Sequence, residues 1–427
     1  MAQKGIREYD AKRMLARAIG EYSGGRFAFD DRLVLVTPET DLARLGKDHP
    51  WLRTEKLVVK PDQLFGKRGK NNLLLLDADL RAAVAWIGER MGKEVTIEGA
   101  GGKTTGVLTH FLIEPFAPHD AEYYLAFTSS RDADTIHFSP QGGVDIESVW
   151  NTVVSIEVPV LTDPAEVDVA SKLPDIPEKE TVAAFVQALY RIYVDYHFTY
   201  LEFNPIAFSR GRLLPLDTVA KLDDTAAFQC ADKWGPIEFP RPFGRAMTKE
   251  EAYVESLDAK TGASLKLTLL NPDGRVWLLV AGGGASVIYA DTVVDLGFGK
   301  ELANYGEYSG DPSTELTYEY TKTLLDLMTR KPDPQGRPKY LLIGGGIANF
   351  TDVAKTFTGI IHALEEYKDK LRKNHVKIYV RRGGPNYEEG LENMRRLGER
   401  IGVPLEVYGP ETHMTRIVSL ALEEAQR

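Results

Sequence analysis

Three polar side chains in the sequence have the chemistry of a metal site. Glu202 and Asn204 lie two positions apart in one apolar run, and Asp217 ends the next apolar run. The turn residues 209–212 between the two runs predict a β-hairpin. Because side chains two apart on a strand share a face, Glu202 and Asn204 point the same way, and Asp217 can join them from the neighbouring strand.

These oxygen ligands suit Mg²⁺, which keeps several waters and is completed by the phosphates of a nucleotide. The three side chains therefore predict a magnesium–nucleotide site built on rigid strands. Two alternatives stay open on these residues alone: a purely structural magnesium, and a solvated strand face that binds nothing.

A basic segment suits the phosphates of the same nucleotide. Lys60 ends the apolar strand predicted over 57–60, and the loop that follows contains Lys67-Arg68-Gly69-Lys70. A lysine on a strand meets a phosphate as a point charge, and a basic loop with glycine can fold over the rest of the phosphate chain. The alternative is a solvated loop tip, which is the more common role of such charges.

Two further segments bear on nucleotide binding. Residues 113–118 predict a strand that runs into an extended segment, whose backbone groups can meet a purine edge, and Glu122 can accept a hydrogen bond from a ribose hydroxyl. Residues 99–104 look like a phosphate loop, but the Walker spacing requires glycine where Ile97 stands. We therefore expect a flexible loop there.

Composition limits the class of protein. The chain has 427 residues, of which 43% are hydrophobic, and this length is enough for about three domains. The 52 basic and 62 acidic side chains give a net charge of −10 without a basic block, which argues against a nucleic-acid partner. The single cysteine, Cys230, excludes an internal disulfide and fits a reducing compartment. No apolar run reaches membrane-spanning length, so we expect a cytoplasmic protein without a membrane partner.

The second half of the sequence repeats one pattern three times. Apolar strands predicted over 276–280, 340–343 and 376–380 are each followed by a glycine-rich turn and then a helix. This succession predicts a doubly wound parallel sheet of the flavodoxin type. In such sheets ligands bind beyond the carboxyl ends of the strands, which is where the glycines and polar residues of this half lie.

Polar residues at those strand ends predict a pocket for a multiply charged carboxylate. Asn349 and Thr351 lie at the start of the helix predicted over 352–364, where free N–H groups and the helix dipole attract anions. Arg382 closes the third strand, and a guanidinium grips a carboxylate with two bonds. Gly310 lets its backbone N–H approach an anion closely. One alternative is that Asn349 and Thr351 only cap the helix. Another is that the adjacent pair Arg381-Arg382 forms a structural ion-pair site.

The segments of the first half together resemble the ATP-grasp fold. With the second half added, the chain resembles ATP-citrate lyase and, more distantly, the β subunit of succinyl-CoA synthetase, nearly from end to end. The segments that carry the resemblance are 57–63, 111–119, 265–272, 281–286, 303–310, 347–351, 381–387 and 411–415. The resemblance implies an α/β chain with an ATP-grasp region of two subdomains over 1–240, a connecting segment over 241–275, and a citrate-binding, flavodoxin-like domain over 276–427.

The resemblance also implies roles for individual residues. Those matched to ATP-binding positions are Lys60, Arg68, Gly69, Pro115, Ala117 and Glu122. Asn204 and Asp217 match magnesium ligands, and Glu202 matches a catalytic carboxylate that meets a phosphohistidine on a partner chain. The segment 257–263 resembles a further metal-contacting stretch through Asp258, Thr261 and Ala263, with Thr261 in place of the family's serine. Those matched to citrate-binding positions are Gly310, Asn349, Thr351, Tyr367 and Arg382.

The family's CoA-binding domain, phosphohistidine loop and citrate-synthase-like module have no counterpart in these 427 residues. The resemblance therefore implies one subunit of a split ATP-citrate lyase, with those modules on a partner chain. ATP phosphorylates the partner's histidine, the phosphoryl group passes to citrate, CoA displaces it to give citryl-CoA, and the partner cleaves citryl-CoA to acetyl-CoA and oxaloacetate. Mg²⁺ is the implied cofactor, with ATP and CoA as co-substrates and CoA held mainly by the partner.

Three alternative functions stay open. The small subunit of a citryl-CoA synthetase stops before cleavage, a succinyl-CoA synthetase-like β subunit uses a smaller acid, and a non-enzymatic scaffold senses citrate or nucleotide without catalysis. The intact Glu202, Asn204 and Asp217 argue against the scaffold. His413 is expected to make a hydrogen bond at a helix start and not to carry a phosphoryl group.

Overall fold

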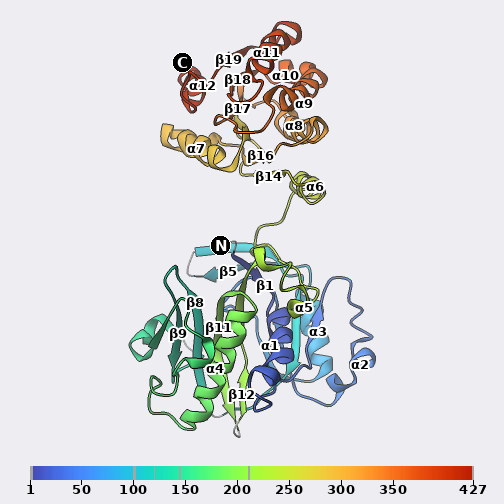
Figure 1. Cartoon of the computed structure of the whole chain (residues 1–427). Helices are drawn as coiled ribbons and strands as arrows, with labels where there is room; N and C mark the ends of the chain where they lie inside the picture. The colour runs from blue at the N-terminus through green and yellow to red at the C-terminus, as the bar shows by residue number, and fades with distance from the viewer. Residues whose placement is uncertain (1–2, 100–101, 120, 144–145, 210–211, 426–427) are drawn as a thin grey trace. The chain divides into compact units, whose positions relative to one another are not determined.

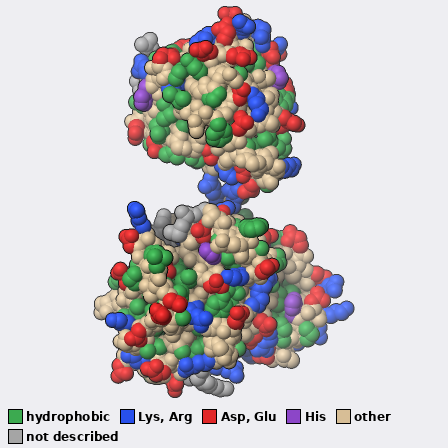
Figure 2. Space-filling view, viewed as in Figure 1, with side chains coloured by type: hydrophobic (Ala, Val, Ile, Leu, Met, Phe, Trp, Pro, Cys, Tyr) green, Lys and Arg blue, Asp and Glu red, His purple; other side chains and the backbone are tan. Residues whose placement is uncertain are grey.

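A computed structural model describes residues 3–99, 102–119, 121–143, 146–209 and 212–425 of the chain. The chain forms two compact units, Met1–Ala246 and Met247–Arg427, which we call unit 1 and unit 2 (Figure 1). Each unit has its own hydrophobic core. Figure 2 shows acidic and basic side chains interspersed over the face of each unit that it displays.

The largest sheet of unit 1 is antiparallel and has seven strands. Its order is β1-β13-β11-β8-β9-β10, and β12 also pairs with β11. The strand bounds are β1 (Gln3–Ile6), β8 (Ala121–Ser129), β9 (Ala133–Ser139), β10 (Val154–Pro159), β11 (Phe198–Ser209), β12 (Arg212–Pro215) and β13 (Thr218–Asp223). Helices α1 (Glu8–Tyr22) and α4 (Lys179–Asp195) bury their apolar faces in the same core as this sheet.

A second sheet of unit 1 has four antiparallel strands in the order β2-β7-β3-β4. The strand bounds are β2 (Val34–Val36), β3 (Leu57–Pro61), β4 (Leu75–Ala78) and β7 (Phe111–Pro115). Helix α3 (Leu80–Arg90) shares the core of this sheet. Two short helices, α2 (Leu45–Asp48) and α5 (Ala231–Trp234), complete the unit. Unit 1 is one compact unit that contains both sheets, and its division into two subdomains stays a prediction.

The expected flexible loop is instead part of a hairpin. Strands β5 (Glu94–Gly99) and β6 (Gly102–Val107) pair along their full length. Residues 100–101 at its tip lie outside the described residues. Threonine and other β-branched residues on both sides of the glycines favour strands. The prediction of a flexible loop did not take this preference into account.

Helix α4 has a one-sided apolar stripe with helical spacing. Its residues Phe185, Leu189, Ile192 and Tyr193 are all buried. A helix with such a one-sided apolar stripe gains most of its stability by packing that stripe on a sheet.

Unit 2 is a doubly wound sheet, as the sequence predicted. The strands lie in the order β14-β16-β15-β17-β18-β19. Their bounds are β14 (Ser264–Leu269), β15 (Val276–Ala281), β16 (Asn304–Ser309), β17 (Lys339–Gly345), β18 (Val376–Arg381) and β19 (Leu405–Tyr408). All neighbours are parallel except β14, which pairs antiparallel with β16. The five parallel strands therefore follow the flavodoxin order 2-1-3-4-5.

Helices cover both faces of this sheet (Figure 1). Along β15, Trp277 and Leu279 face one core, whereas Leu278 and Val280 face the other. The first core also receives α6 (Lys249–Asp258), α8 (Thr314–Thr329), α9 (Val353–Glu366), α10 (Lys368–Lys373) and α11 (Tyr387–Ile401). The second receives α7 (Gly283–Val293) and α12 (Arg416–Ala425).

The expected connecting segment over 241–275 differs from the structure. The division between the units falls after Ala246, and most of the segment forms α6 and β14 of unit 2. A capping box starts α6: Glu251 N donates to Thr248 Oγ1 at 3.1 Å, and Thr248 N donates to the Glu251 carboxylate at 2.8 Å. The Thr-x-x-Glu spacing is a helix-start signal in the sequence that the prediction of a linker missed.

Among the helices formed by the described residues, none combines the length and the apolar composition that a membrane span requires.

Candidate functional site

The first candidate site is a buried ion cluster at the start of α1. Lys60 Nζ lies 2.7 Å from Glu8 Oε1, and Arg68 Nη1 lies 2.7 Å from Glu8 Oε2. The exposed fractions of the three side chains are 3% for Lys60, 7% for Arg68 and 1% for Glu8. Two predicted nucleotide residues from different segments therefore meet on one carboxylate that sequence analysis did not select.

Two more residues complete this cluster. Lys12 Nζ lies 2.9 Å from Glu8 Oε1 and 2.7 Å from Glu114 Oε2, and Lys60 Nζ lies 2.8 Å from Glu114 Oε1. Both ammonium groups donate to the carbonyl oxygen of Leu216, at 3.0 and 2.6 Å. The i,i+4 spacing of Glu8 and Lys12 was the sequence signal for this pair. No local sequence pattern connects the Glu8–Lys12 pair to Glu114, which lies on the second sheet.

Backbone groups fix the position of Glu8. Glu8 N and Tyr9 N donate to the two oxygens of Asp62, at 2.8 and 3.0 Å, so Asp62 satisfies the first turn of α1. Thr218 N donates to Glu8 Oε1 at 3.2 Å. The carboxylate of Glu8 is therefore held between α1, the end of β3 and the start of β13.

Glu8 and Lys60 stay ionised at neutral pH. Burial by itself raises the pKa of Glu8, but the nearby Lys12, Lys60 and Arg68 outweigh it and hold that pKa well below its usual range. Burial likewise lowers the pKa of Lys60, but Glu114, Glu8 and Asp217 outweigh it and raise that pKa. A buried set of permanently charged cations, held by fixed acids, is suited to the phosphates of a nucleotide.

The candidate metal ligands lie beside this cluster. Glu202 and Asn204 are partly exposed on β11 and lie on either side of buried Phe203, as two side chains on one face of a strand do. Strands β12 and β13 both pair with β11, and Asp217 lies in the break between them. Asn204 N donates to Asp217 O at 3.2 Å, so the backbone brings these two residues together.

The donor set fits Mg²⁺ completed by a nucleotide. Among the described residues, no group of three or more histidine, cysteine or acidic side chains is placed to hold a metal. Asn204 and Asp217 carry hard oxygens of the kind that Mg²⁺ uses when phosphates and waters fill the rest of its shell, and their role as metal ligands stays a prediction. Asp217 Oδ1 accepts a hydrogen bond from Arg68 Nη1 at 2.8 Å, so the metal and phosphate candidates are in direct contact.

The purine and ribose candidates are joined by a histidine that sequence analysis missed. The ring of His119 lies 2.8 Å from the Ala117 carbonyl through Nδ1 and 2.7 Å from Glu122 Oε1 through Nε2. Pro115 ends β7 directly before this segment. Gly143, at φ +70°, packs so closely on Glu122 that a Cβ there would lie 1.9 Å from its Oε2. Gly143 N also donates to Asn204 Oδ1 at 2.9 Å, which connects the ribose candidate to the metal candidates.

Gly69, the remaining nucleotide candidate, is exposed in the turn that follows Arg68. Its carbonyl accepts a hydrogen bond from Asn72 N at 3.2 Å, and Leu73 N donates to Arg68 O at 2.9 Å. These bonds close the loop behind the buried guanidinium of Arg68.

The second candidate site lies at the carboxyl ends of the strands of unit 2. Gly310 follows β16 with φ +75°, Asn349 and Thr351 lie between β17 and α9, and Arg382 follows β18. Ala348 N donates to Gly383 O at 2.9 Å, which ties the loop after β17 to the loop after β18. The structure thus brings these four candidates to one edge of the sheet.

Asn349 and Thr351 are not the caps of α9. Asp352 is the cap: it accepts from Lys355 N at 2.9 Å and from Asn386 Nδ2 at 2.7 Å. Asn349 is exposed and Thr351 is half-buried. The capping alternative is therefore wrong, and both side chains remain available at the helix start.

The two neighbouring arginines differ in their roles. Arg381 donates through Nη1, Nε and Nη2 to three backbone carbonyls, at 3.0, 2.9 and 3.1 Å, and is structural. Arg382 is only 5% exposed and donates through Nη1 to Gly346 O, while its Nε is buried without a hydrogen-bond partner among the described residues. Burial lowers the pKa of Arg382. A buried guanidinium with an unused donor at a strand end is suited to an anionic ligand.

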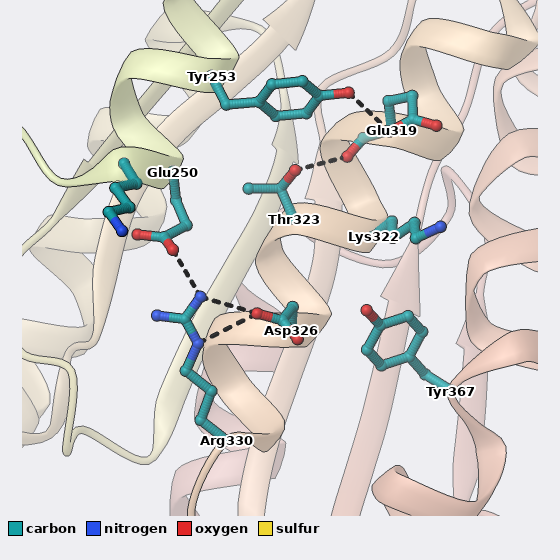
Figure 3. A pocket seen from close by; sticks show the side chains of 9 residues that line it. Glu250, Tyr253, Glu319, Lys322, Thr323, Asp326, Arg330 and Tyr367 are labelled. Carbon is teal, nitrogen blue, oxygen red and sulfur yellow. Dashed lines mark hydrogen bonds and ion pairs between the residues drawn. The ribbon is translucent and has the colours of Figure 1, made fainter.

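Tyr367 lies away from the other citrate candidates. It is the residue after α9, whose 14 residues span about 21 Å, whereas Thr351 lies just before the helix. Tyr367 instead lines a pocket of about 310 Å³ between α6 and α8 (Figure 3). Arg330 pairs there with Glu250 at 2.5 Å and with Asp326 at 2.8 Å. The structure therefore does not group Tyr367 with Gly310, Asn349, Thr351 and Arg382.

The remaining metal candidates lie in unit 2, beside Gly310. The two oxygens of Asp258 accept from Leu265 N at 2.7 Å and from Lys266 Nζ at 2.6 Å. Thr261 donates to Ala263 O at 3.5 Å, and a Cβ on Gly310 would lie 3.2 Å from Ala263 Cα. Protein donors already occupy the carboxylate of Asp258, so its metal role stays a prediction, and the segment forms a wall beside Gly310.

Comparisons with known proteins match both units. Residues 2–234 match the family model described as the ATP-citrate synthase ATP-grasp domain, and residues 245–424 match the one described as ATP citrate lyase citrate-binding. The chain is 49% identical over 426 residues to ATP-citrate synthase alpha chain protein 2 of Arabidopsis thaliana, covering 99% of both chains. It is 48% identical over 428 residues to ATP-citrate synthase of Homo sapiens, covering 99% of this chain but 38% of the human protein.

A solved structure is similar over the whole chain. It is ATP citrate lyase from Methanothrix soehngenii in complex with citrate and coenzyme A, with a TM-score of 0.88 and 57% sequence identity. The match covers 99% of this chain and 100% of that chain.

Proposed function

The chain belongs to the ATP-citrate synthase family, and we propose that it is the subunit that binds ATP and citrate for ATP-citrate lyase. That enzyme converts citrate, ATP and CoA to acetyl-CoA, oxaloacetate, ADP and phosphate. The observation that carries the proposal is a pair of anion sites of different chemistry, one in each unit. Unit 1 holds a buried group of three cations beside hard oxygen ligands, and unit 2 holds a buried arginine with an unused donor at a strand end.

In unit 1, Lys60 and Arg68 bind the nucleotide phosphates, with Gly69 in the loop beside them. The backbone of Pro115 and Ala117 meets the purine, and Glu122 binds the ribose. Asn204 and Asp217 hold Mg²⁺, which neutralises charge during phosphoryl transfer when it is bound. Glu202, on the same strand face as Asn204, meets the phosphohistidine of the partner.

In unit 2, the citrate carboxylates are divided among three kinds of donor. Arg382 grips one carboxylate, Asn349 and Thr351 at the start of α9 bind another, and the backbone at Gly310 approaches the rest. This division is supported by their common position at the carboxyl ends of neighbouring parallel strands.

A partner subunit is implied because the chain spans 38% of the human relative, and a 45% identical relative in Schizosaccharomyces pombe is named a probable subunit 2. We infer that this partner carries the phosphohistidine, CoA-binding and citrate-synthase-like modules, and that both chains are cytoplasmic. The companion that co-purifies tests this: a chain with the lyase module supports the lyase, and one without it supports a citryl-CoA synthetase.

Labelled ATP tests the division of labour between the chains. The isolated chain is expected to take up no phosphoryl label, because the phosphohistidine is assigned to the partner. Among the described residues, His413 Nδ1 lies 3.0 Å from Thr415 Oγ1 and accepts from Thr415 N at 3.4 Å, as expected of a histidine at a helix start. Label is expected on the partner once both chains are mixed with Mg²⁺. An acid-labile label on this chain alone that disappears in His413→Ala contradicts the assignment.

Calorimetry with two acids tests the citrate site. Succinate has one carboxylate fewer than citrate, so it leaves part of the donor set unpaired. Buried donors without partners cost about 1–3 kcal/mol each, so succinate is expected to bind at least roughly tenfold more weakly than citrate. Equal affinities for the two acids would remove the physical basis of the citrate assignment, whereas tighter binding of succinate would favour the succinyl-CoA synthetase alternative.

A further inference from the structure

One ion pair joins the two halves of the nucleotide site. Arg68 Nη1 lies 2.8 Å from Asp217 Oδ1. On the proposed function, Arg68 is a phosphate ligand and Asp217 is a metal ligand. In the ion pair, Asp217 therefore occupies the guanidinium that a phosphate would bind, and Arg68 occupies the carboxylate that a metal would bind.

The Arg68 side of this pair is fixed. The same Nη1 also donates to Glu8 Oε2 at 2.7 Å, and the side chain of Arg68 is only 7% exposed. Its Nε is buried and has no hydrogen-bond partner among the described residues. When Asp217 departs, Glu8 keeps the guanidinium in place, and the N–H of Nη1 that Asp217 releases can donate to a phosphate oxygen.

The Asp217 side of the pair can move. Its side chain is 39% exposed, compared with 1% for Glu8, and the residue lies in the break between β12 and β13. Apart from its ion pair with Arg68, Asp217 is held among the described residues through its backbone carbonyl, which accepts from Asn204 N at 3.2 Å. The carboxylate can therefore turn from Arg68 toward a cation held at Asn204 without a change in the sheet.

We propose that the Arg68–Asp217 pair makes this site selective for the metal complex of a nucleoside triphosphate over the free cation and over the metal-free nucleotide. The proposal rests on the proposed function of unit 1. A free divalent cation that takes Asp217 removes one of the two carboxylates that neutralise Arg68, leaving Glu8, and it faces the positive charge of Lys60 as well. A metal-free triphosphate that takes Arg68 is placed against the released carboxylate of Asp217. Only the complex replaces both halves of the pair at once, so the metal and the nucleotide favour each other's binding.

Asp217→Asn separates two effects of this carboxylate: its repulsion of metal-free ATP and its coordination of the metal. The amide removes the competing charge, so the affinity of the full chain for ATP in excess EDTA is expected to rise by at least about fivefold, the lower end of typical coupling between sites. The affinity for Mg–ATP is expected to fall, because the metal loses a ligand. The two effects have opposite signs, which a variant with a disturbed fold cannot produce. Both are measured by calorimetry, and no turnover is needed.

Two further variants complete the experiment. Arg68→Gln releases Asp217 and is expected to tighten the binding of Mg²⁺ alone while weakening ATP. Glu55→Gln is the matched control, because it breaks an exposed ion pair with Arg32 of similar exposure, 41% for Glu55 and 40% for Arg32, away from the cluster. It is expected to change neither affinity.

The outcomes distinguish this inference from the function on which it rests. If Asp217→Asn weakens Mg–ATP but leaves metal-free ATP unchanged or weaker, the selectivity role of the pair is wrong and the nucleotide site stands. If Asp217→Asn and Arg68→Gln both leave Mg–ATP affinity unchanged, the nucleotide assignment itself is wrong. Opposite shifts in Asp217→Asn support both, and they do so even if Arg68→Gln fails to fold.

Discussion

Replacing Glu8 with alanine is expected to lower the free energy of unfolding of unit 1 by about 3–5 kcal/mol, the usual cost of breaking a buried ion pair by removing one partner. Glu8 is 1% exposed and accepts from Lys12, Lys60 and Arg68, so its loss leaves buried cations without their shared acceptor. Urea unfolding followed by tryptophan fluorescence reports mainly on unit 1, which contains Trp51, Trp86, Trp150 and Trp234, whereas unit 2 contains Trp277.

The control for this substitution is Glu89→Ala. Glu89 pairs with Arg90 at 3.2 Å on the surface, where its side chain is 73% exposed, and such pairs contribute about 0–1 kcal/mol. A loss in Glu8→Ala no larger than in Glu89→Ala would show that the cluster does not stabilise the unit.

The pH dependence of the Glu8 effect has a defined sign. Because the folded protein lowers the pKa of Glu8, its stabilising contribution is fully present above the unfolded pKa of about 4.3 and is lost as the pH falls below that value. The difference in stability between the wild-type chain and Glu8→Gln is therefore expected to be constant from pH 5 to pH 7 and to shrink in more acidic solution. A difference that grows on acidification contradicts the assigned charge state.

Arg382→Lys is expected to weaken citrate binding by roughly ten- to a hundredfold, because a hydrogen bond to a charged group contributes about 1.5–3 kcal/mol and an ammonium cannot form the two-pronged contact. Arg382 is nearly fully buried, so water cannot supply the second donor that a lysine at this position lacks. Calorimetry with citrate measures the loss, and ATP affinity is expected to stay the same because Lys60 and Arg68 lie in the other unit.

Arg395→Lys provides the matched control for the citrate experiment. Arg395 lies on α11 with a side chain that is 50% exposed, and its ion pair with Glu392 at 3.7 Å is on the surface. It is expected to leave citrate affinity unchanged. A citrate affinity that is the same in Arg382→Lys as in Arg395→Lys would remove Arg382 from the site.

Local sequence patterns determined the elements of both units and the face on which key residues lie. The shared face of Glu202 and Asn204 follows from the two-residue period of a strand, and the buried stripe of α4 follows from the helical period. The repeated strand, glycine turn and helix of unit 2 predicted the sheet that brings Asn349, Thr351 and Arg382 to one edge. These features depend on neighbours within a few residues, so the sequence contains them directly.

Tertiary structure alone decided which distant residues meet. Glu8 contacts Lys60 and Arg68 across 52 and 60 positions, and Lys12 contacts Glu114 across 102, because α1 packs where the two sheets of unit 1 approach each other. The same holds for β14, whose Leu267 pairs with Gly306 of β16, 39 positions further along the chain. Tyr367 was separated from the other citrate candidates by the length of α9. No periodicity encodes such contacts, since they depend on the packing of elements that the chain brings together only when it folds.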